Sequence, residues 1–229
     1  KKRRQLFLCR DRAGAKPLYY YFENNVFLFS SELKTFHCHP SFKKRININA
    51  LSEYMDFGFI PSPYSIFKKC HKLSGGHTLL YELNSKQINI NQYWDVTEFY
   101  NKPKINIPYN DAKEKLLEIL ISSFKYRLVS DVPVGLFLSG GYDSSAVAAI
   151  LQNNLTKKLK TFTIGFNEGN NEANYAKKIA KYLNTDHIEY YCTTKDAQDI
   201  IHRLPLYFDE PFADSSAIPT ILLSQIARN

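Results

Sequence analysis

The seven residues Ser139-Gly140-Gly141-Tyr142-Asp143-Ser144-Ser145 lie between two segments of different character. Residues 132–138 form a continuous apolar run that is typical of a strand buried on both faces. Residues 144–152 are rich in Ala, Val, Ile and Leu and predict a helix. The alternation continues with predicted strands at 161–166 and 187–192 and predicted helices at 173–183, 194–203 and from 218 onward. Strict alternation of strand and helix predicts βαβ units and a parallel sheet.

The chemistry of this loop suits a phosphate group. In open α/β sheets, ligands bind at the carboxyl ends of the strands, and Gly140 and Gly141 allow backbone N–H groups to approach an anion closely. The positive end of the following helix points to the same place. Asp143 repels a phosphate unless a cation such as Mg²⁺ bridges the two groups. We expect a β-branched residue at Gly140 to cost activity with only a modest loss of stability.

The loop matches neither of two common nucleotide-binding motifs. The chain contains no G-x-x-x-x-G-K-[ST] and no G-x-G-x-x-G. The pattern S-G-G-x-D-S instead resembles the pyrophosphate loop of the ATP pyrophosphatases, which split ATP between the α- and β-phosphates. The loop by itself is compatible with several enzymes of this kind. These are NAD, GMP and argininosuccinate synthetases, tRNA-modifying thiolases, β-lactam synthetase and asparagine synthetase.

The flanking segments narrow this choice. Residues 10–20, R-D-R-A-G-A-K-P-L-Y-Y, resemble the R-D-x-x-G-x-K-P-L-Y-Y signature of glutamine-hydrolysing asparagine synthetases. Residues 209–220 resemble their D-E-P-x-x-D-x-S-x-x-P-T stretch. Shorter similarities to the same family lie at residues 30–34, 73–77, 93–95 and 161–166. The resemblance covers nearly the whole chain.

The resemblance implies a chain of two parts, with a fold class of α/β plus α+β. Residues 1–100 would be the remnant of an Ntn-hydrolase glutaminase domain, and residues 101–110, with two prolines, would be a linker. Residues 111–229 would be the first half of a parallel-sheet adenine-nucleotide α-hydrolase (PP-loop) domain, the asparagine synthetase domain of the family.

We expect the chain to be an internal piece of a longer protein, because residue 1 is lysine and the sole methionine is Met55. The cysteine nucleophile of the family's glutaminase would then precede Lys1. The family's G-D-G-x-D-E segment, which meets pyrophosphate, would follow Asn229. We therefore expect this piece to be inactive alone.

The resemblance also assigns candidate site residues. The ATP loop would comprise Leu138, Ser139, Gly140, Gly141, Asp143, Ser144 and Ser145, with Asp143 as the Mg²⁺ ligand. Ile164 and Gly165 would contact the adenosine part of ATP. Asp209, Glu210 and Asp214 have two open interpretations: they order the site near the substrate, or they cap the next helix together with Ser215 and Ser216.

The implied reaction is that of a ligase: ATP-dependent amidation of aspartate to asparagine through β-aspartyl-AMP, with ammonia released from glutamine. One alternative is a related amidotransferase that acts on another carboxylate in polysaccharide or secondary metabolism. Two others are a non-catalytic nucleotide-binding module and an RNA-modifying ATP pyrophosphatase. The expected cofactors are ATP and Mg²⁺. The expected partners are the small molecules ATP, aspartate, and glutamine or ammonia. A homodimer is a possible assembly, and no nucleic-acid or membrane partner is expected.

Composition and charge exclude several classes of protein. The chain is 44% hydrophobic and 23% charged, which is ordinary for a globular protein. No apolar run approaches the roughly 18–20 residues of a membrane span. The four cysteines have no C-x-x-C spacing, so a zinc ribbon is not indicated. Residues 1–45 hold 11 Lys or Arg and 3 Asp or Glu, and we interpret this basic end as a solvated surface. An ATP-dependent synthetase is expected in the cytoplasm.

Two histidine-containing features have simpler explanations than a metal site or a catalytic base. His37-Cys38-His39 has the composition of a metal site, but adjacent ligands at a helix end point apart. His187 follows the predicted helix 173–183 and is expected at a strand edge rather than as a general base.

Overall fold

The computed structural model describes residues 4–166 and 172–228. The chain divides into two compact units, the first formed by Lys1–Lys104 with Arg203–Asp214, and the second by Ile105–His202 with Ser215–Asn229. The chain therefore passes between the units at three points in its sequence. This division differs from the expected one, which placed all residues after 110 in a single domain, because Arg203–Asp214 makes its contacts within the first unit.

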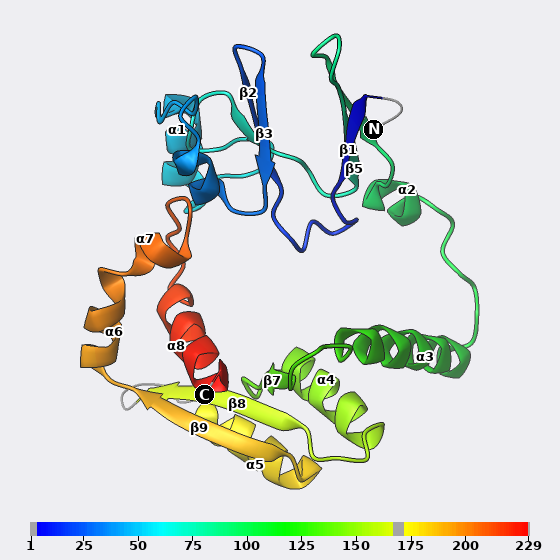
Figure 1. Cartoon of the computed structure of the whole chain (residues 1–229). Helices are drawn as coiled ribbons and strands as arrows, with labels where there is room; N and C mark the ends of the chain where they lie inside the picture. The colour runs from blue at the N-terminus through cyan, green and yellow to red at the C-terminus, as the bar shows by residue number, and fades with distance from the viewer. Residues whose placement is uncertain (1–3, 167–171, 229) are drawn as a thin grey trace. The chain divides into compact units, whose positions relative to one another are not determined.

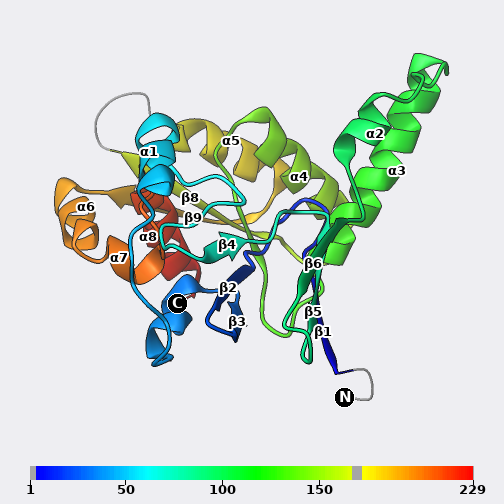
Figure 2. The same cartoon turned by 90° about the horizontal axis from the view of Figure 1, so that it is seen from above.

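The first unit is built on two antiparallel three-stranded sheets. One sheet has the order β1-β5-β6, and its strands are β1 (Gln5–Cys9), β5 (His77–Glu82) and β6 (Ile88–Gln92), which run side by side in Figure 2. The other has the order β3-β2-β4, with strands β2 (Tyr19–Glu23), β3 (Val26–Ser30) and β4 (Cys70–Lys72). Its helices are η1 (Leu33–Cys38), α1 (Ile48–Phe57), α2 (Val96–Tyr100) and α7 (Leu204–Tyr207). This is an α+β architecture.

Aromatic and aliphatic side chains join the two sheets of this unit. Tyr20 from β2 and Tyr81 from β5 belong to one buried cluster, and the ring of Phe27 stacks on that of Tyr81 at a centroid separation of 4.3 Å. A second cluster, which includes Tyr21 and Phe36, fills the space beneath η1 and α1. Most strand residues in the first unit therefore serve packing.

The Arg10–Asp11 motif of the first unit is explained by local structure. The guanidinium of Arg10 donates to the carbonyl oxygens of Lys16, Leu73 and Gly14 at 2.8, 2.5 and 2.9 Å. The Asp11 carboxylate accepts the backbone N–H of Ala15 at 3.0 Å, and this hydrogen bond lowers the pKa of Asp11. The motif thus closes the turn after β1.

The second unit contains the parallel sheet that the alternating pattern predicts. Its strands β7 (Gly135–Phe137), β8 (Lys160–Phe166) and β9 (Asp186–Cys192) pair in parallel in that order. Its helices are α3 (Tyr109–Arg127), α4 (Tyr142–Asn153), α5 (Ala173–Leu183), α6 (Thr194–Ile201) and α8 (Ala217–Arg228). The prediction of a buried strand over residues 132–138 was too long, because only three residues pair with β8 and Val132 is exposed.

Helices cover both faces of this sheet, and Figure 1 shows α5 and α8 on opposite faces. The core between sheet and helices includes Leu138, Ala148 and Ala176. Phe124, near the end of α3, packs against this core, but none of the α3 residues is buried. Leu116 and Leu117 of α3 are exposed, so this helix is covered mainly toward its C-terminal end.

Three further features can be placed in the part of the chain that the structure describes. Lys1 to Arg3 of the basic run lie outside it. Within it, no group of three or more His, Cys, Asp or Glu residues is arranged to hold a metal, at His37 and His39 or elsewhere. No helix between residues 4 and 166 or between 172 and 228 has both the length and the apolarity needed to cross a membrane.

Candidate nucleotide site

The loop between β7 and α4 is held together by serine hydroxyls. The Oγ atoms of Ser139 and Ser144 lie 3.0 Å apart, and Ser144 Oγ also accepts the backbone N–H of Ser139 at 3.3 Å. Ser139 Oγ accepts the N–H of Gly141 at 3.3 Å, and Ser145 Oγ donates to the Gly141 carbonyl at 2.6 Å. The loop therefore has a defined shape before any ligand binds. The first N–H groups of α4 have no partner within the helix and remain available to an anion.

The strand end before the loop is fixed to β8. Leu138 is 1% exposed, and its N–H donates to the carbonyl of Phe162 at 2.8 Å. The Thr163 hydroxyl donates to the Leu138 carbonyl. These two hydrogen bonds attach the start of the loop to the central strand of the sheet, so Leu138 acts as an anchor for the loop.

Gly140 is required by the backbone of the loop. Its φ is +84°, a conformation that residues other than glycine rarely adopt. A Cβ at this position would lie 2.8 Å from Tyr175 Cβ and 2.9 Å from the backbone nitrogen of Ala176. These contacts favour a larger loss of stability for a β-branched residue than the modest loss expected from the sequence. Gly141 differs, because a Cβ there would meet only Ser139 Oγ, at 3.3 Å.

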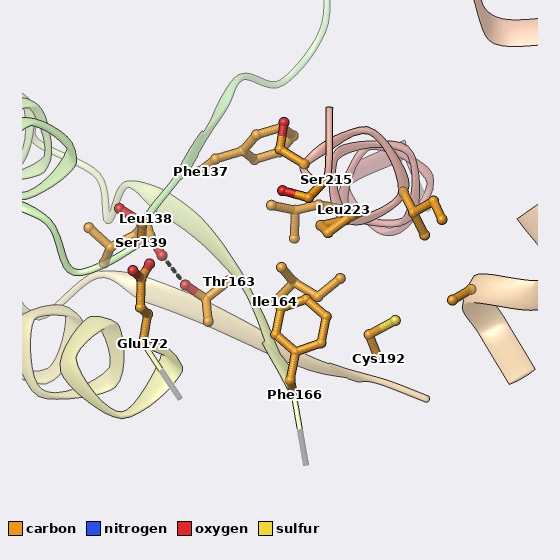
Figure 3. Close-up of a pocket in the computed structure, with 14 residues that line it drawn as sticks. Phe137, Leu138, Ser139, Thr163, Ile164, Phe166, Glu172, Cys192, Ser215 and Leu223 are labelled. Atoms are coloured by element: carbon orange, nitrogen blue, oxygen red, sulfur yellow. Dashed lines mark hydrogen bonds between the residues drawn. The ribbon is translucent and has the colours of Figure 1, made fainter. Parts of the chain in front are cut away.

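A cavity of about 780 Å³ opens at the carboxyl ends of β8 and β9. Its walls come from the strand ends and from the chain around α8, as Figure 3 shows. Ala197 of α6 adds to them. The lining is mainly apolar and comprises Phe137, Leu138, Ser139, Thr163, Ile164, Phe166, Glu172, Cys192, Ala197, Ser215, Ser216, Ile218, Pro219 and Leu223. A cavity of this size and character suits a nucleoside.

A second hollow of about 550 Å³ lies over the loop itself. It is lined by Ser139, Gly140, Gly141, Tyr142, Ser145, Glu172, Tyr175 and Ile179. Ser139 and Glu172 line both spaces, so the two spaces adjoin at these residues. The apolar cavity and the glycine-rich hollow together form a site with one apolar part and one part suited to an anion.

The carboxylate of Asp143 is free for a ligand. Asp143 lies in the first turn of α4 and is exposed, and its carboxylate has no hydrogen bond or ion pair with any described residue. One carboxylate fits Mg²⁺, which commonly takes one or two protein carboxylates and completes its coordination with phosphate and water.

The remaining predicted residues are found in different places. Ile164 lines the apolar cavity, whereas Gly165 is buried in β8 and does not line it. Asp209 and Glu210 hydrogen-bond to backbone N–H groups of the first unit, those of Leu33 and Ile66. Leu33 is the first residue of η1, so the Asp209 carboxylate lies at the N-terminal end of that helix, and neither contact is with α8. The interpretation that these carboxylates order the site near the substrate stays a prediction.

Several lining residues were not predicted from the sequence. Phe166, Cys192 and Leu223 form much of the apolar wall, and Ser215 and Ser216 add hydroxyl groups at the start of α8. Burial raises the pKa of the Cys192 thiol, so this side chain is a neutral wall residue. His187 pairs with Thr161 near the start of β8, at the end of the sheet away from the loop.

Two family patterns match different parts of the chain. The sequence pattern of the family described as Asparagine synthase matches residues 115–229, and that of the Glutamine amidotransferase domain matches residues 1–94. The chain belongs to the asparagine synthase family. Its relatives within this family include proteins from archaea and bacteria.

A Methanocaldococcus jannaschii protein, provisionally named asparagine synthetase [glutamine-hydrolyzing] 2, is 40% identical over 100% of this chain and 44% of its own length. Asparagine synthetases [glutamine-hydrolyzing] 3 and 1 of Bacillus subtilis are 32% and 31% identical, over 92% and 97% of this chain and 36% and 34% of their own lengths. The chain thus spans less than half the length of these relatives. The structure of an NH3-dependent NAD synthetase from Campylobacter jejuni is 18% identical to this chain and has a TM-score of 0.36. The match covers 50% of this chain and 52% of that protein, and this likeness carries no argument here.

Proposed function

We propose that this chain carries the ATP site of a glutamine-dependent asparagine synthetase. The observation that carries the proposal is the pairing of a glycine-rich loop at the start of α4 with an adjoining apolar cavity. The apolar cavity would take the adenosine, with Ile164 and Phe166 in its wall. The hollow over Gly140 and Gly141 would take the phosphates.

The proposed reaction has two steps. A β-carboxylate oxygen of aspartate attacks the α-phosphorus of ATP, the bond to the β-phosphate oxygen breaks, and pyrophosphate leaves. Ammonia then attacks the activated carbonyl carbon, AMP leaves, and a proton is released as asparagine forms. The loop's backbone N–H groups and serine hydroxyls would hold the departing pyrophosphate. Mg²⁺, bound by Asp143 and phosphate, would offset part of its charge.

The first unit supports the proposal that the ammonia comes from glutamine. Its match to the Glutamine amidotransferase domain and its two packed antiparallel sheets fit a remnant of an Ntn-hydrolase glutaminase. We further propose the cytoplasm as the compartment, because the reaction consumes ATP, and a homodimer as the assembly.

Replacement of Asp143 tests the assignment of the ATP loop. In the protein expressed from its complete reading frame, Asp143→Ala should lower AMP formation with saturating ammonia by about 100-fold or more. Glutamine hydrolysis should stay within about twofold of wild type, because ammonia is made elsewhere. Asp199→Ala is the matched control, since Asp199 is an exposed carboxylate of the same unit on α6.

Two results would change the proposal. Equal loss of both activities in a folded Asp143→Ala protein would mean that Asp143 supports the structure rather than the ATP site. AMP formation with a carboxylate other than aspartate, and none with aspartate, would replace the proposed acceptor.

A further inference from the structure

Glu172 lies where the apolar cavity and the glycine-rich hollow meet. Among the described residues, Ser139 and Glu172 are the two that line both spaces. The Ser139 hydroxyl contacts the Ser144 hydroxyl and accepts the N–H of Gly141, so it is used within the loop. Glu172 supplies a carboxylate at the same junction, and Figure 3 shows its side chain directed toward Ser139.

The backbone of Glu172 has a fixed place beside the loop. Glu172 precedes α5, and its carbonyl accepts the N–H groups of Tyr175 and Ala176 at 3.0 and 3.1 Å. The same two residues pack against the loop, because a Cβ at Gly140 would lie 2.8 Å from Tyr175 Cβ and 2.9 Å from the nitrogen of Ala176. The loop and the first turn of α5 are therefore in direct contact, and both belong to the second unit.

The carboxylate of Glu172 is not used by the fold. Glu172 is exposed, and its side chain makes no capping hydrogen bond to α5. Among residues 4–166 and 172–228, it has no ion-pair partner and no hydrogen-bond donor. A free carboxylate next to a phosphate site is unfavourable unless a cation or a hydrogen-bond donor of the ligand faces it. The side chain is therefore available to a part of the ligand that donates hydrogen bonds.

The ribose of ATP is the part that reaches this junction. It connects the adenine to the phosphates, so it crosses the shared space when adenine occupies the apolar cavity and the phosphates lie over Gly140 and Gly141. The ribose carries two neighbouring hydroxyl groups that can donate hydrogen bonds. An ionised carboxylate accepts hydrogen bonds at both of its oxygens, and an acidic side chain binds a ribose hydroxyl in dinucleotide-binding folds.

We propose that Glu172 accepts hydrogen bonds from the ribose 2′- and 3′-hydroxyls of ATP and makes the site select ribonucleotides over deoxyribonucleotides. The inference rests on the proposed function in one respect, that the two spaces take ATP. Asp143 remains the ligand of Mg²⁺ in this assignment. Because a hydrogen bond to a charged group changes affinity by roughly ten- to a hundredfold, the selection is large enough to measure.

The test compares ATP with 2′-deoxy-ATP and 3′-deoxy-ATP in the protein from its complete reading frame and in its Glu172→Ala variant. Isothermal titration calorimetry with Mg²⁺ gives the Kd of each nucleotide. The wild-type protein should bind ATP about tenfold or more tightly than either deoxy analogue. In Glu172→Ala, ATP should bind about tenfold or more weakly than to wild type. Its advantage over the analogues should fall to within about twofold, because neither hydroxyl has its acceptor.

Glu118→Ala is the matched control. Glu118 is an exposed carboxylate on α3 of the same unit and lines neither space. This variant should keep the wild-type ratio of affinities for ATP and the deoxy analogues. Glu172→Gln is a second variant that keeps the side-chain length and one acceptor oxygen. It should retain about a threefold preference for ATP, and it serves as the test in the event that Glu172→Ala does not fold.

The proposal is overturned if wild type binds ATP and both deoxy analogues equally, or if Glu172→Ala keeps the wild-type preference. Equal weakening of all three nucleotides in Glu172→Ala, with a higher requirement for Mg²⁺, also overturns it and assigns Glu172 to the metal. ATP binding without AMP formation in the presence of aspartate and ammonia would contradict the proposed function, and the ratio of affinities would still decide the role of Glu172. A wild-type protein that binds no ATP contradicts both.

Discussion

The hydroxyl oxygens of Ser139 and Ser144 lie 3.0 Å apart and join the two ends of the loop that precedes α4. Ser144 is on the helix and Ser139 follows the strand, so the contact holds strand end and helix start together. The N–H of Ser139 also donates to Ser144 Oγ at 3.3 Å. One side chain, that of Ser144, therefore accounts for two of the contacts that shape the loop.

Replacement of Ser144 should weaken ATP binding through this loop. In Ser144→Ala we expect the KM for ATP in AMP formation to rise roughly three- to tenfold, the loss associated with about one hydrogen bond. Ser123→Ala is the control, because Ser123 is an exposed serine on α3 of the same unit and lines neither the cavity nor the hollow. An unchanged KM in Ser144→Ala would show that the loop keeps its shape without the serine pair.

The two glycines of the loop should differ in their tolerance of a side chain. Gly140→Val places a Cβ at positive φ and against the backbone of α5, so the free energy of unfolding should fall by about 1–3 kcal/mol. Gly141→Ala should lower it by less than about 1 kcal/mol, because its Cβ meets only a serine hydroxyl. Urea unfolding of both variants measures the difference. Equal losses would mean that the loop backbone relaxes to accept a Cβ at Gly140.

The second unit should lose stability as the pH falls below about 6.5, the ordinary pKa of histidine. Burial lowers the pKa of His187, whose Nδ1 lies 2.9 Å from Thr161 Oγ1 and whose Nε2 has no partner among the described residues. The unfolded chain then binds a proton that the folded chain does not, so stability is full above pH 6.5 and falls as pH drops toward the folded pKa.

His187→Asn removes this titration. The protection of the β8 amides against hydrogen exchange should therefore fall less as the pH drops. Hydrogen exchange of β8 at pH 7.5 and 5.5, corrected for the intrinsic rate, provides the measurement. His202→Asn, a change of an exposed histidine in the same unit, should behave as wild type. A His187→Asn protein with the wild-type pH dependence would show that His187 does not cause the loss.

Local patterns predicted the loop and the sheet around it. The glycine pair, the serines and the alternating strand and helix segments are all encoded within short stretches, and the parallel pairing of β7, β8 and β9 confirms the predicted sheet. The exact length of β7 was not predicted, because pairing with β8 rather than apolar character decides where a strand begins.

The long-range parts of the site could not be predicted in the same way. Leu223 and Ser215 lie at least 70 residues after the loop in the sequence, and only folding brings them to the same cavity. The segment that contains Asp209 and Glu210 is recognisable as a motif, but its partners Leu33 and Ile66 are more than 140 residues away. A motif therefore identified these carboxylates without indicating what they contact.

The products formed from ATP test the central claim, that the Ser139–Ser145 loop binds a leaving pyrophosphate. The loop has no lysine with which to reach the β- and γ-phosphates, and its glycine pair lies at a helix start, an arrangement suited to a diphosphate. The protein from its complete reading frame is incubated with aspartate, glutamine and ATP labelled at the α-phosphate. We predict that the label appears in AMP, with one pyrophosphate released for each AMP. Label in ADP, with release of inorganic phosphate, would contradict the account.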